Sequence, residues 1–147
     1  MYFVDRSKIS KTLIYIDDLL QAFDNVHSFQ SNLDYLGLER LAHMLIESML
    51  DVGNMMIDGF IMRDPGSYED IIDILVDEKV IPVQHQQGFK EVVQLRKMIV
   101  RDYLHINHDE LKEVLSKHYQ ALKQFSAFIT TYLDNELGVA HAFSNEE

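Results

Sequence analysis

The chain has 147 residues, of which 47% are hydrophobic and 25% are charged, and this length and composition suit one globular domain with a sizeable core. Its formal net charge of −11 disfavours a surface that coats nucleic acid non-specifically, although a small basic cleft is compatible with it. The absence of cysteine excludes disulfides and thiolate chemistry. No apolar run approaches the roughly 20 residues that span a bilayer, and the first residues carry no signal-peptide segment, so no membrane contact and a cytoplasmic location are expected.

Apolar residues recur at helical spacing along most of the chain, and no β-type alternation of any length interrupts them. The spacing predicts a first helix over about Asp5–Ser28 and a second over about Leu33–Met62. Ser31 and Asn32 between them supply turn and N-cap chemistry. A turn is predicted where Asp64-Pro65-Gly66 follows the second helix.

A third helix is predicted over about Tyr68–Lys79, because Ser67 with Asp70 three residues later resembles an N-terminal capping signature. Pro82 ends this segment, since the residue before a proline avoids the helical region. A fourth helix is predicted over about Gln86–Leu104.

The last long helix is expected to start after Asn107, with Glu110 completing its cap, and to reach about Glu136, with Gly138 as its stop. His118 lies on its apolar seam and is expected to be a packed, hydrogen-bonded histidine rather than a metal ligand. The sequence therefore predicts an all-α up-and-down bundle of about five helices. We expect one domain over residues 1–143 and a disordered tail over residues 144–147.

The fourth helix contains the string LRKMIVRDYLHI, which places Arg96 where the pattern requires an apolar residue. The residues on the same predicted helical face are Phe89, Val92, Ile99, Val100 and Tyr103. A guanidinium stays charged and is rarely buried without a partner. We therefore expect carboxylates or backbone carbonyls, from this chain or a second one, to meet Arg96.

A polar stripe runs along the second predicted helix. Its members are His43, Glu47, Asp51, Asn54 and Asp58, at offsets of 4, 4, 3 and 4. One interpretation is a solvated face, and the sharper one is that Glu47 and Asp51 meet Arg96. Gly53 weakens the middle of this helix, so we expect it to mark a close approach of another helix.

The motifs of the chain bear on three kinds of chemistry: metal binding, nucleophilic catalysis and phosphodiester cleavage. The histidines show neither H-E-x-x-H nor paired E-x-x-H motifs, so no metal site is expected, and neither a G-x-S-x-G elbow nor a glycine-rich phosphate loop is present. Phosphodiester chemistry remains, because Arg96, Lys97, Arg101 and Tyr103 cluster in an otherwise acidic chain and cations stabilise phosphate charge. The alternative, a buried Arg96 paired with acids beside exposed Lys97 and Arg101, stays open.

The same residues resemble the HepT-like branch of the HEPN proteins, whose signature R-x-x-x-x-H-x-Y sits in strings like LRNxLVHxY. Here Leu95–Tyr103 reads LRKMIVRDY. The family's second helix resembles LERxLxxxIExxLDxxNxxI, and the residues in step here are Leu38, Glu39, Arg40, Ile46, Glu47, Leu50, Asp51, Asn54 and Ile57. The tyrosine-led short helix, the Ile81-Pro82 turn and the long final helix also fit, so the resemblance covers nearly the whole chain.

The resemblance implies a HEPN bundle that forms a homodimer and acts as a metal-independent toxin ribonuclease without a cofactor. RNA is its implied substrate, and a minimal nucleotidyltransferase antitoxin is its implied partner. By the same resemblance, Arg96 matches the phosphate-holding arginine and Tyr103 matches the tyrosine to which the antitoxin attaches AMP. In the resulting hypothesis Arg96, Arg101 and Tyr103 form the site, with Glu47, Asp51, Asn54 and Lys97 supporting it.

Position 101 departs from the family, because Arg101 stands where the signature has histidine. An arginine cannot be deprotonated in practice, so Arg101 supplies charge but no general base. His105 and His108 are substitutes only if the helix breaks near Ile106. On an ideal helix, Arg96 and Arg101 lie about 140° apart, so we expect a joint site to need distortion of the helix or a second chain. The alternative to a ribonuclease is a non-catalytic dimeric HEPN module that binds a nucleotide or a partner protein.

Overall fold

The computed structural model describes residues 4–144, and within that range every regular element is helical. The elements in chain order are α1 (Arg6–Asn25), α2 (Asn32–Gly59), α3 (Tyr68–Asp77), the 3-10 turn η1 (Val83–His85), α4 (Gln86–Val100), the 3-10 turn η2 (Tyr103–His105), α5 (His108–Lys117), α6 (Tyr119–Lys123) and α7 (Phe125–Ser144). The all-α prediction is therefore confirmed. Of the predicted disordered tail, Ser144 ends α7 and residues 145–147 lie outside the described residues.

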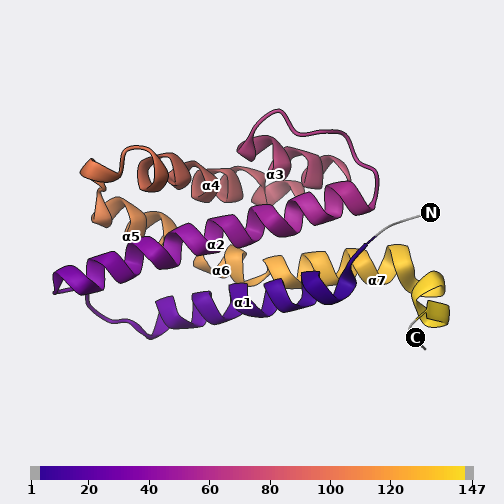
Figure 1. Cartoon of the computed structure of the whole chain (residues 1–147), viewed down its shortest axis with the longest axis horizontal. Helices are drawn as coiled ribbons and strands as arrows, with labels where there is room; N and C mark the ends of the chain where they lie inside the picture. Colours follow the sequence, from indigo (N-terminus) through magenta and orange to yellow (C-terminus); the bar gives the residue numbers. More distant parts are fainter. Residues whose placement is uncertain (1–3, 145–147) are drawn as a thin grey trace.

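The long helix α2 is the centre of the bundle. It packs against α1, α3, α4 and α5, so that α3 and α4 lie along one flank and α1 along the other, beside α7 (Figure 1). Its core face is almost entirely apolar and includes Leu38, Leu45, Met49, Val52 and Met56, each at most 1% exposed. Burial of this stripe, rather than local propensity, supplies most of the stability of such a helix. No helix in the described part combines the length and apolarity needed to cross a bilayer.

Three predicted N-caps are confirmed. The Ser31 hydroxyl accepts the Asp34 N–H, and the Asp34 carboxylate accepts the Ser31 N–H in return. Ser67 caps α3 and Asn107 caps α5 in the same way, each accepting a backbone N–H three residues on. Each cap satisfies a donor that the first helical turn would otherwise leave unpaired.

Gly53 marks a close helix contact, as expected. A Cβ atom at this position would lie 2.5 Å from Cγ2 of Ile71, so α3 approaches the backbone of α2 more closely than a larger residue would allow. Ile71, Ile72, Ile74 and Leu75 of α3 are buried. The absence of a side chain at Gly53 therefore allows α3 to pack close to α2.

The predicted ends of the first four helices were too late, since α1 ends at Asn25 rather than Ser28 and α3 at Asp77 rather than Lys79. The second helix ends at Gly59 rather than Met62, and α4 ends at Val100 rather than Leu104. At the end of α4, the N–H groups of Arg101 and Asp102 both donate to the Lys97 carbonyl, which turns the chain out of the helix. Tyr103 consequently leaves the helical face that it was predicted to share with Arg96.

The predicted final helix is divided into α5, α6 and α7, with breaks at His118 and Gln124. His118 is packed and hydrogen-bonded, as predicted: its Nε2 pairs with Glu91 of α4, and its ring occupies the space beside Gly88. This contact across helices holds the chain at the first break. The prediction of a stop at Gly138 was wrong, because α7 continues to Ser144.

Candidate functional site

Arg96 makes the contact that its position predicted. Its Nε donates to Oε1 of Glu47 over 2.6 Å, and its side chain is only 20% exposed. The guanidinium carbon lies 4.1 Å from the centroid of the Tyr68 ring, in the geometry of a cation–π contact. Asp51, one turn further along α2, is exposed and makes no ion pair with Arg96 among the described residues, so that part of the prediction was wrong.

A cleft of about 560 Å³ opens beside Arg96. Its lining comes from α2, from the start of α3 and from the end of α4, and includes Asn54, Ser67, Tyr68, Arg96, Lys97 and Arg101. A cavity of this volume is within the range of small-molecule and cofactor sites. The structure thus brings together four of the seven residues predicted for the site.

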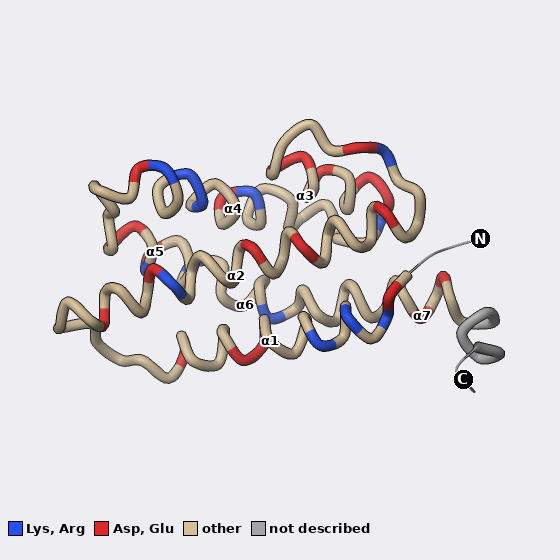
Figure 2. The backbone as a smooth tube through the Cα atoms, in the orientation of Figure 1, with Lys and Arg blue, Asp and Glu red and all other residues tan. Residues whose placement is uncertain are grey.

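Arg96 and Arg101 both line this cleft within one chain, and Arg101 lies beyond the last residue of α4, outside the ideal helix on which the 140° separation was based. Arg101 is the C-cap residue directly after Val100, the last residue of α4, and Lys97 lies four residues before it. Cations in the last turn are favourable there, because the carbonyl end of a helix carries partial negative charge. Figure 2 shows these Lys and Arg positions at the end of α4, in a chain whose other helices carry many acidic positions.

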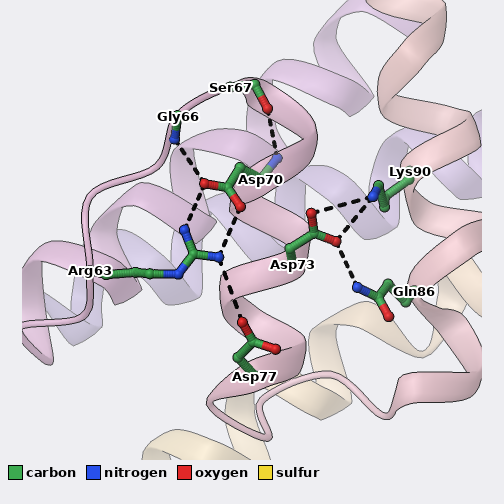
Figure 3. A network of polar contacts seen from close by, with 8 residues as sticks. All are labelled: Arg63, Gly66, Ser67, Asp70, Asp73, Asp77, Gln86 and Lys90. Carbon is green, nitrogen blue, oxygen red and sulfur yellow. Dashed lines mark hydrogen bonds and ion pairs between the residues drawn. The ribbon is translucent and has the colours of Figure 1, made fainter.

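The turn before α3 forms one wall of the cleft and is fixed by Asp70 (Figure 3). The Arg63 guanidinium donates to both Asp70 oxygens, over 2.7 and 2.9 Å, and the Gly66 N–H donates to the same carboxylate over 2.8 Å. These contacts, Arg63 first and Gly66 second, lower the pKa of Asp70 to about 2. The network therefore holds Ser67 and Tyr68 in place at the mouth of the cleft.

A second carboxylate joins α3 to α4 in the same network. Asp73 accepts a hydrogen bond from the Gln86 amide over 2.6 Å and pairs with the Lys90 ammonium at 3.1 Å (Figure 3). Both partners stand on the first turns of α4, whose far end carries Arg96. The two walls of the cleft are thus tied together at the opposite end of α4.

Tyr103 lies outside the cleft. It belongs to η2 and is 62% exposed, and it lines a neighbouring depression together with Arg101, Leu104 and His105. Arg101 lines both hollows and connects them. The predicted site is therefore divided between the cleft with Arg96 and the exposed turn with Tyr103.

The histidines near the site differ in their surroundings. His108 Nε2 lies 2.7 Å from Glu39, and its ring packs on Tyr35, so it has a structural partner. His105 is exposed beside Arg101. His43 Nε2 lies 3.6 Å from the same Glu47 oxygen that holds Arg96. Over the described residues, no group of three or more His, Asp or Glu side chains is placed to hold a metal ion.

Tyr68 is the site residue that sequence reasoning missed. Its ring contacts Arg96 across 28 positions, and no periodic pattern within one helix links a residue of α3 to one of α4. The available signal was an aromatic residue directly after the capping serine of a short helix. That signal identifies a helix start, but it does not say which helix the side chain meets.

Comparison with known proteins identifies the family. The family model described as "Ribonuclease HepT-like" matches residues 9–129. The Bacillus subtilis (strain 168) protein named "Putative RNase YutE" is 50% identical over 143 residues, which cover 97% of this chain and 99% of that protein. The solved structure of YutE, described as a cytosolic protein of unknown function, has a TM-score of 0.91 and 50% identity, over 94% of this chain and 96% of its own.

More distant structures share the fold. A tri-AMPylated Shewanella oneidensis HEPN toxin in complex with MNT antitoxin has a TM-score of 0.70 at 22% identity, over 85% of this chain and 95% of that one. A toxin–antitoxin structure with AMP-PNP has a TM-score of 0.67 at 22% identity, over 84% of this chain and 95% of that one. At these identities the likeness shows the helical fold of HEPN toxins. Together with the family match over most of its length, it places the chain in the HepT-like ribonuclease family.

Proposed function

We propose that this protein is a HepT-like ribonuclease that cleaves RNA without a metal ion, and that Arg96 holds the phosphate at the bond to be cleaved. The observation that carries the proposal is the cleft in which Arg96, Lys97 and Arg101 line one hollow. Glu47 accepts a hydrogen bond from the Nε of Arg96. The two Nη nitrogens of Arg96 make no ion pair within the described residues. They are the donors that suit two phosphate oxygens.

The reaction that fits this cleft is attack of a ribose 2′-oxygen on the adjacent phosphorus. The 2′-hydroxyl gives its proton to a base, the new O–P bond forms, the P–O5′ bond breaks and the leaving oxygen gains a proton. Cations around the phosphate stabilise the negative charge that develops in this step. Lys97 and Arg101 supply that charge beside Arg96.

The general base must come from a group other than Arg101, because guanidinium does not accept a proton. His108 is engaged by Glu39. His105 is exposed in the depression that Arg101 also lines. We therefore assign the role of base to His105 in this proposal, since an imidazole exchanges protons near neutral pH.

The proposal for assembly and regulation is taken from the family resemblance. We propose that the protein is a cytoplasmic homodimer and that its partner is a minimal nucleotidyltransferase antitoxin that modifies Tyr103. Support comes from the exposure of Tyr103 on η2, where a partner enzyme has access to its hydroxyl. The distant HEPN toxin that is tri-AMPylated and bound to MNT antitoxin offers a parallel in fold only.

The test is a ribonuclease assay on purified protein in the presence of EDTA. We expect the wild type to cleave RNA and Arg96→Ala to lose cleavage, because the phosphate loses its main ligand. Arg96→Lys keeps the charge but not the paired donors, and should retain only a small part of the activity. Arg40→Ala removes an exposed arginine of α2 outside the cleft and should cleave like the wild type.

Circular dichroism and melting of each variant show whether the fold is kept. Wild-type cleavage that disappears with EDTA would contradict the metal-independent mechanism. Full activity in a folded Arg96→Ala variant would remove Arg96 from the site, and with it the proposal.

The second candidate is a non-catalytic dimeric module that binds a nucleotide or a partner protein in the same cleft. Arg101 in the place of the motif histidine favours it, because this substitution removes the expected proton acceptor. Under this alternative, the wild type shows no cleavage and Arg101→His creates it. Under the first proposal, the wild type is active already and His105→Ala reduces cleavage strongly.

A further inference from the structure

We propose that Tyr68 is a stacking platform for a base of single-stranded RNA, so that the cleft binds one nucleotide through its base and its phosphate together. This inference rests on the proposed function, because it specifies what the cleft around Arg96 accepts. It adds a residue from α3 to a site whose other proposed members stand on α2, on α4 and in η2.

Neither burial nor a hydrogen bond within the described residues accounts for the exposed ring of Tyr68. Its side chain is the first of α3 and is 48% exposed, although the apolar residues that follow it are buried. Its hydroxyl makes no hydrogen bond among the described residues, so neither burial nor a polar contact accounts for tyrosine here. Within the part of the chain that the structure describes, its ring makes a cation–π contact with Arg96, whose guanidinium carbon lies 4.1 Å from the ring centroid.

The ring is held ready for a ligand. Ser67 caps α3 directly before it, and Asp70 binds both Arg63 and the Gly66 N–H, which fixes the turn that presents the ring (Figure 3). Arg96 limits the ring from one side, and Glu47 limits Arg96 in turn. A platform that is ordered before binding loses less conformational entropy when a ligand arrives.

The residues around the ring match the parts of a nucleotide. Tyr68 offers an aromatic surface on which any base can stack, and Arg96, Lys97 and Arg101 offer cations for the adjoining phosphates. Asn54 in the same lining carries both a donor and an acceptor for a base edge. The cleft volume of about 560 Å³ suits a small ligand of nucleotide size.

Single-stranded RNA is favoured over a duplex for a physical reason. A base in a duplex is already stacked and paired, so reaching Tyr68 would cost the energy of both contacts, whereas an unpaired base is free to stack. An acidic peptide would use the three cations but would leave the aromatic surface without a role.

The experiment measures fluorescence anisotropy of two labelled oligonucleotides of equal length, one with normal bases and one abasic. Both carry 2′-O-methyl groups, so the attacking hydroxyl is absent and binding is separated from cleavage. We expect Tyr68→Ala to raise the Kd of the base-bearing strand by about 5- to 150-fold, the effect of losing one aromatic–base stack, and to leave the Kd of the abasic strand unchanged. Tyr68→Phe keeps the ring and should bind like the wild type.

Tyr15→Ala is the matched control, since Tyr15 is an exposed tyrosine of α1 outside the cleft. An equal loss of affinity for both strands in Tyr68→Ala would mean that the ring only positions Arg96, and would overturn the inference. Unchanged affinity for both strands would overturn it as well. In either case wild-type binding to RNA leaves the proposed function standing. A folded wild type that binds neither strand would reject the proposed function and the inference together.

Discussion

Glu47 is the residue through which α2 acts on the proposed catalytic arginine. It accepts the Arg96 Nε over 2.6 Å, a charge-assisted bond that fixes one edge of the guanidinium and turns the other edge toward the cleft. We expect Glu47→Gln to lower kcat by about tenfold and to change KM less, because a neutral amide orients the guanidinium less firmly. Separate measurement of kcat and KM tests this positioning role.

Asp51→Asn is the control for Glu47→Gln, because Asp51 stands one turn away on the same stripe without contacting Arg96. It should keep the wild-type kcat. A folded Glu47→Gln variant with unchanged kcat, or with a change in KM alone, would show that Arg96 needs no orientation from α2.

Residue spacing predicted the partner of Arg96 but not the other contacts. The helical stripe pointed to Glu47 and Asp51 together, because both repeat on one face. One turn along a helix is a shift of about 5.4 Å, more than a hydrogen bond spans, so a single carboxylate reaches the guanidinium. Tyr68 was not predictable, since its contact depends on how the turn between α2 and α3 folds.

At the level of elements, the chain leaves α2 through a left-handed residue that is not glycine, two positions beyond the end of the helix at Gly59. Ile61 has φ 56° and is 72% exposed, and the Met62 N–H beyond it donates to the Ile57 carbonyl over 2.9 Å. A β-branched residue is strained in this conformation, and glycine is not. We expect Ile61→Gly to raise the free energy of unfolding by about 0.5–1 kcal/mol, which is the relief of strain less the greater chain entropy of glycine. Urea denaturation measures this change in the free energy of unfolding.

Ile14→Gly tests the explanation for Ile61→Gly. Ile14 is exposed in the middle of α1, where glycine weakens a helix, so this variant should lose about 0.5–1 kcal/mol. Lower stability in Ile61→Gly as well would mean that Ile61 makes a favourable contact that outweighs its backbone strain.

The Asp70 network predicts a loss of stability in acid. The pKa of Asp70 is lowered from its ordinary 3.8 to about 2, because its ionised form is bound first by Arg63 and then by the Gly66 N–H. A lowered pKa adds stability that is fully present above the ordinary value and is lost as the pH falls through the folded value. The free energy of unfolding should therefore fall between pH 4 and pH 2 by less in Asp70→Asn than in the wild type.

Urea denaturation at a series of pH values measures this difference. Asp51→Asn serves again as the control, because it removes a carboxylate outside the network, and its pH profile should follow the wild type. An Asp70→Asn profile parallel to the wild type over this range would contradict the assigned cause.

Helix starts were more predictable than helix ends, and the reason is local chemistry. Ser31, Ser67 and Asn107 accept backbone N–H groups three residues on, a contact that needs no other part of the chain. The ends depend on left-handed residues or on tertiary contacts. The left-handed residue after α2 is Ile61 rather than a glycine, whereas Gly138 lies within α7 and does not end it.

At the scale of the whole molecule, an acidic chain carries one small basic cleft. With a net charge of −11, long-range attraction of RNA is weak, so binding must come from the few cations that touch phosphate. The family and the bundle were predictable because motif strings and helical periods repeat along the chain. The division of the site between the cleft and η2 was not, because it follows from the end of α4 at Val100.

For the proposed homodimer, we predict a contact surface at η2. Leu104 is 80% exposed there, and with the exposed Tyr103 directly before it the turn presents two neighbouring large side chains that a second copy could cover. We expect the wild type to sediment at twice the chain mass of 17.2 kDa, and Leu104→Glu to sediment as a monomer, because a carboxylate would lose its water in the interface.

Ile14→Glu places the same charge on an exposed position of α1, and this control variant should remain a dimer. Dimeric Leu104→Glu would move the interface away from η2, and a monomeric wild type would reject the dimer itself. Because Tyr103 adjoins Leu104, the same interface would bring the proposed modification site of each chain close to its copy.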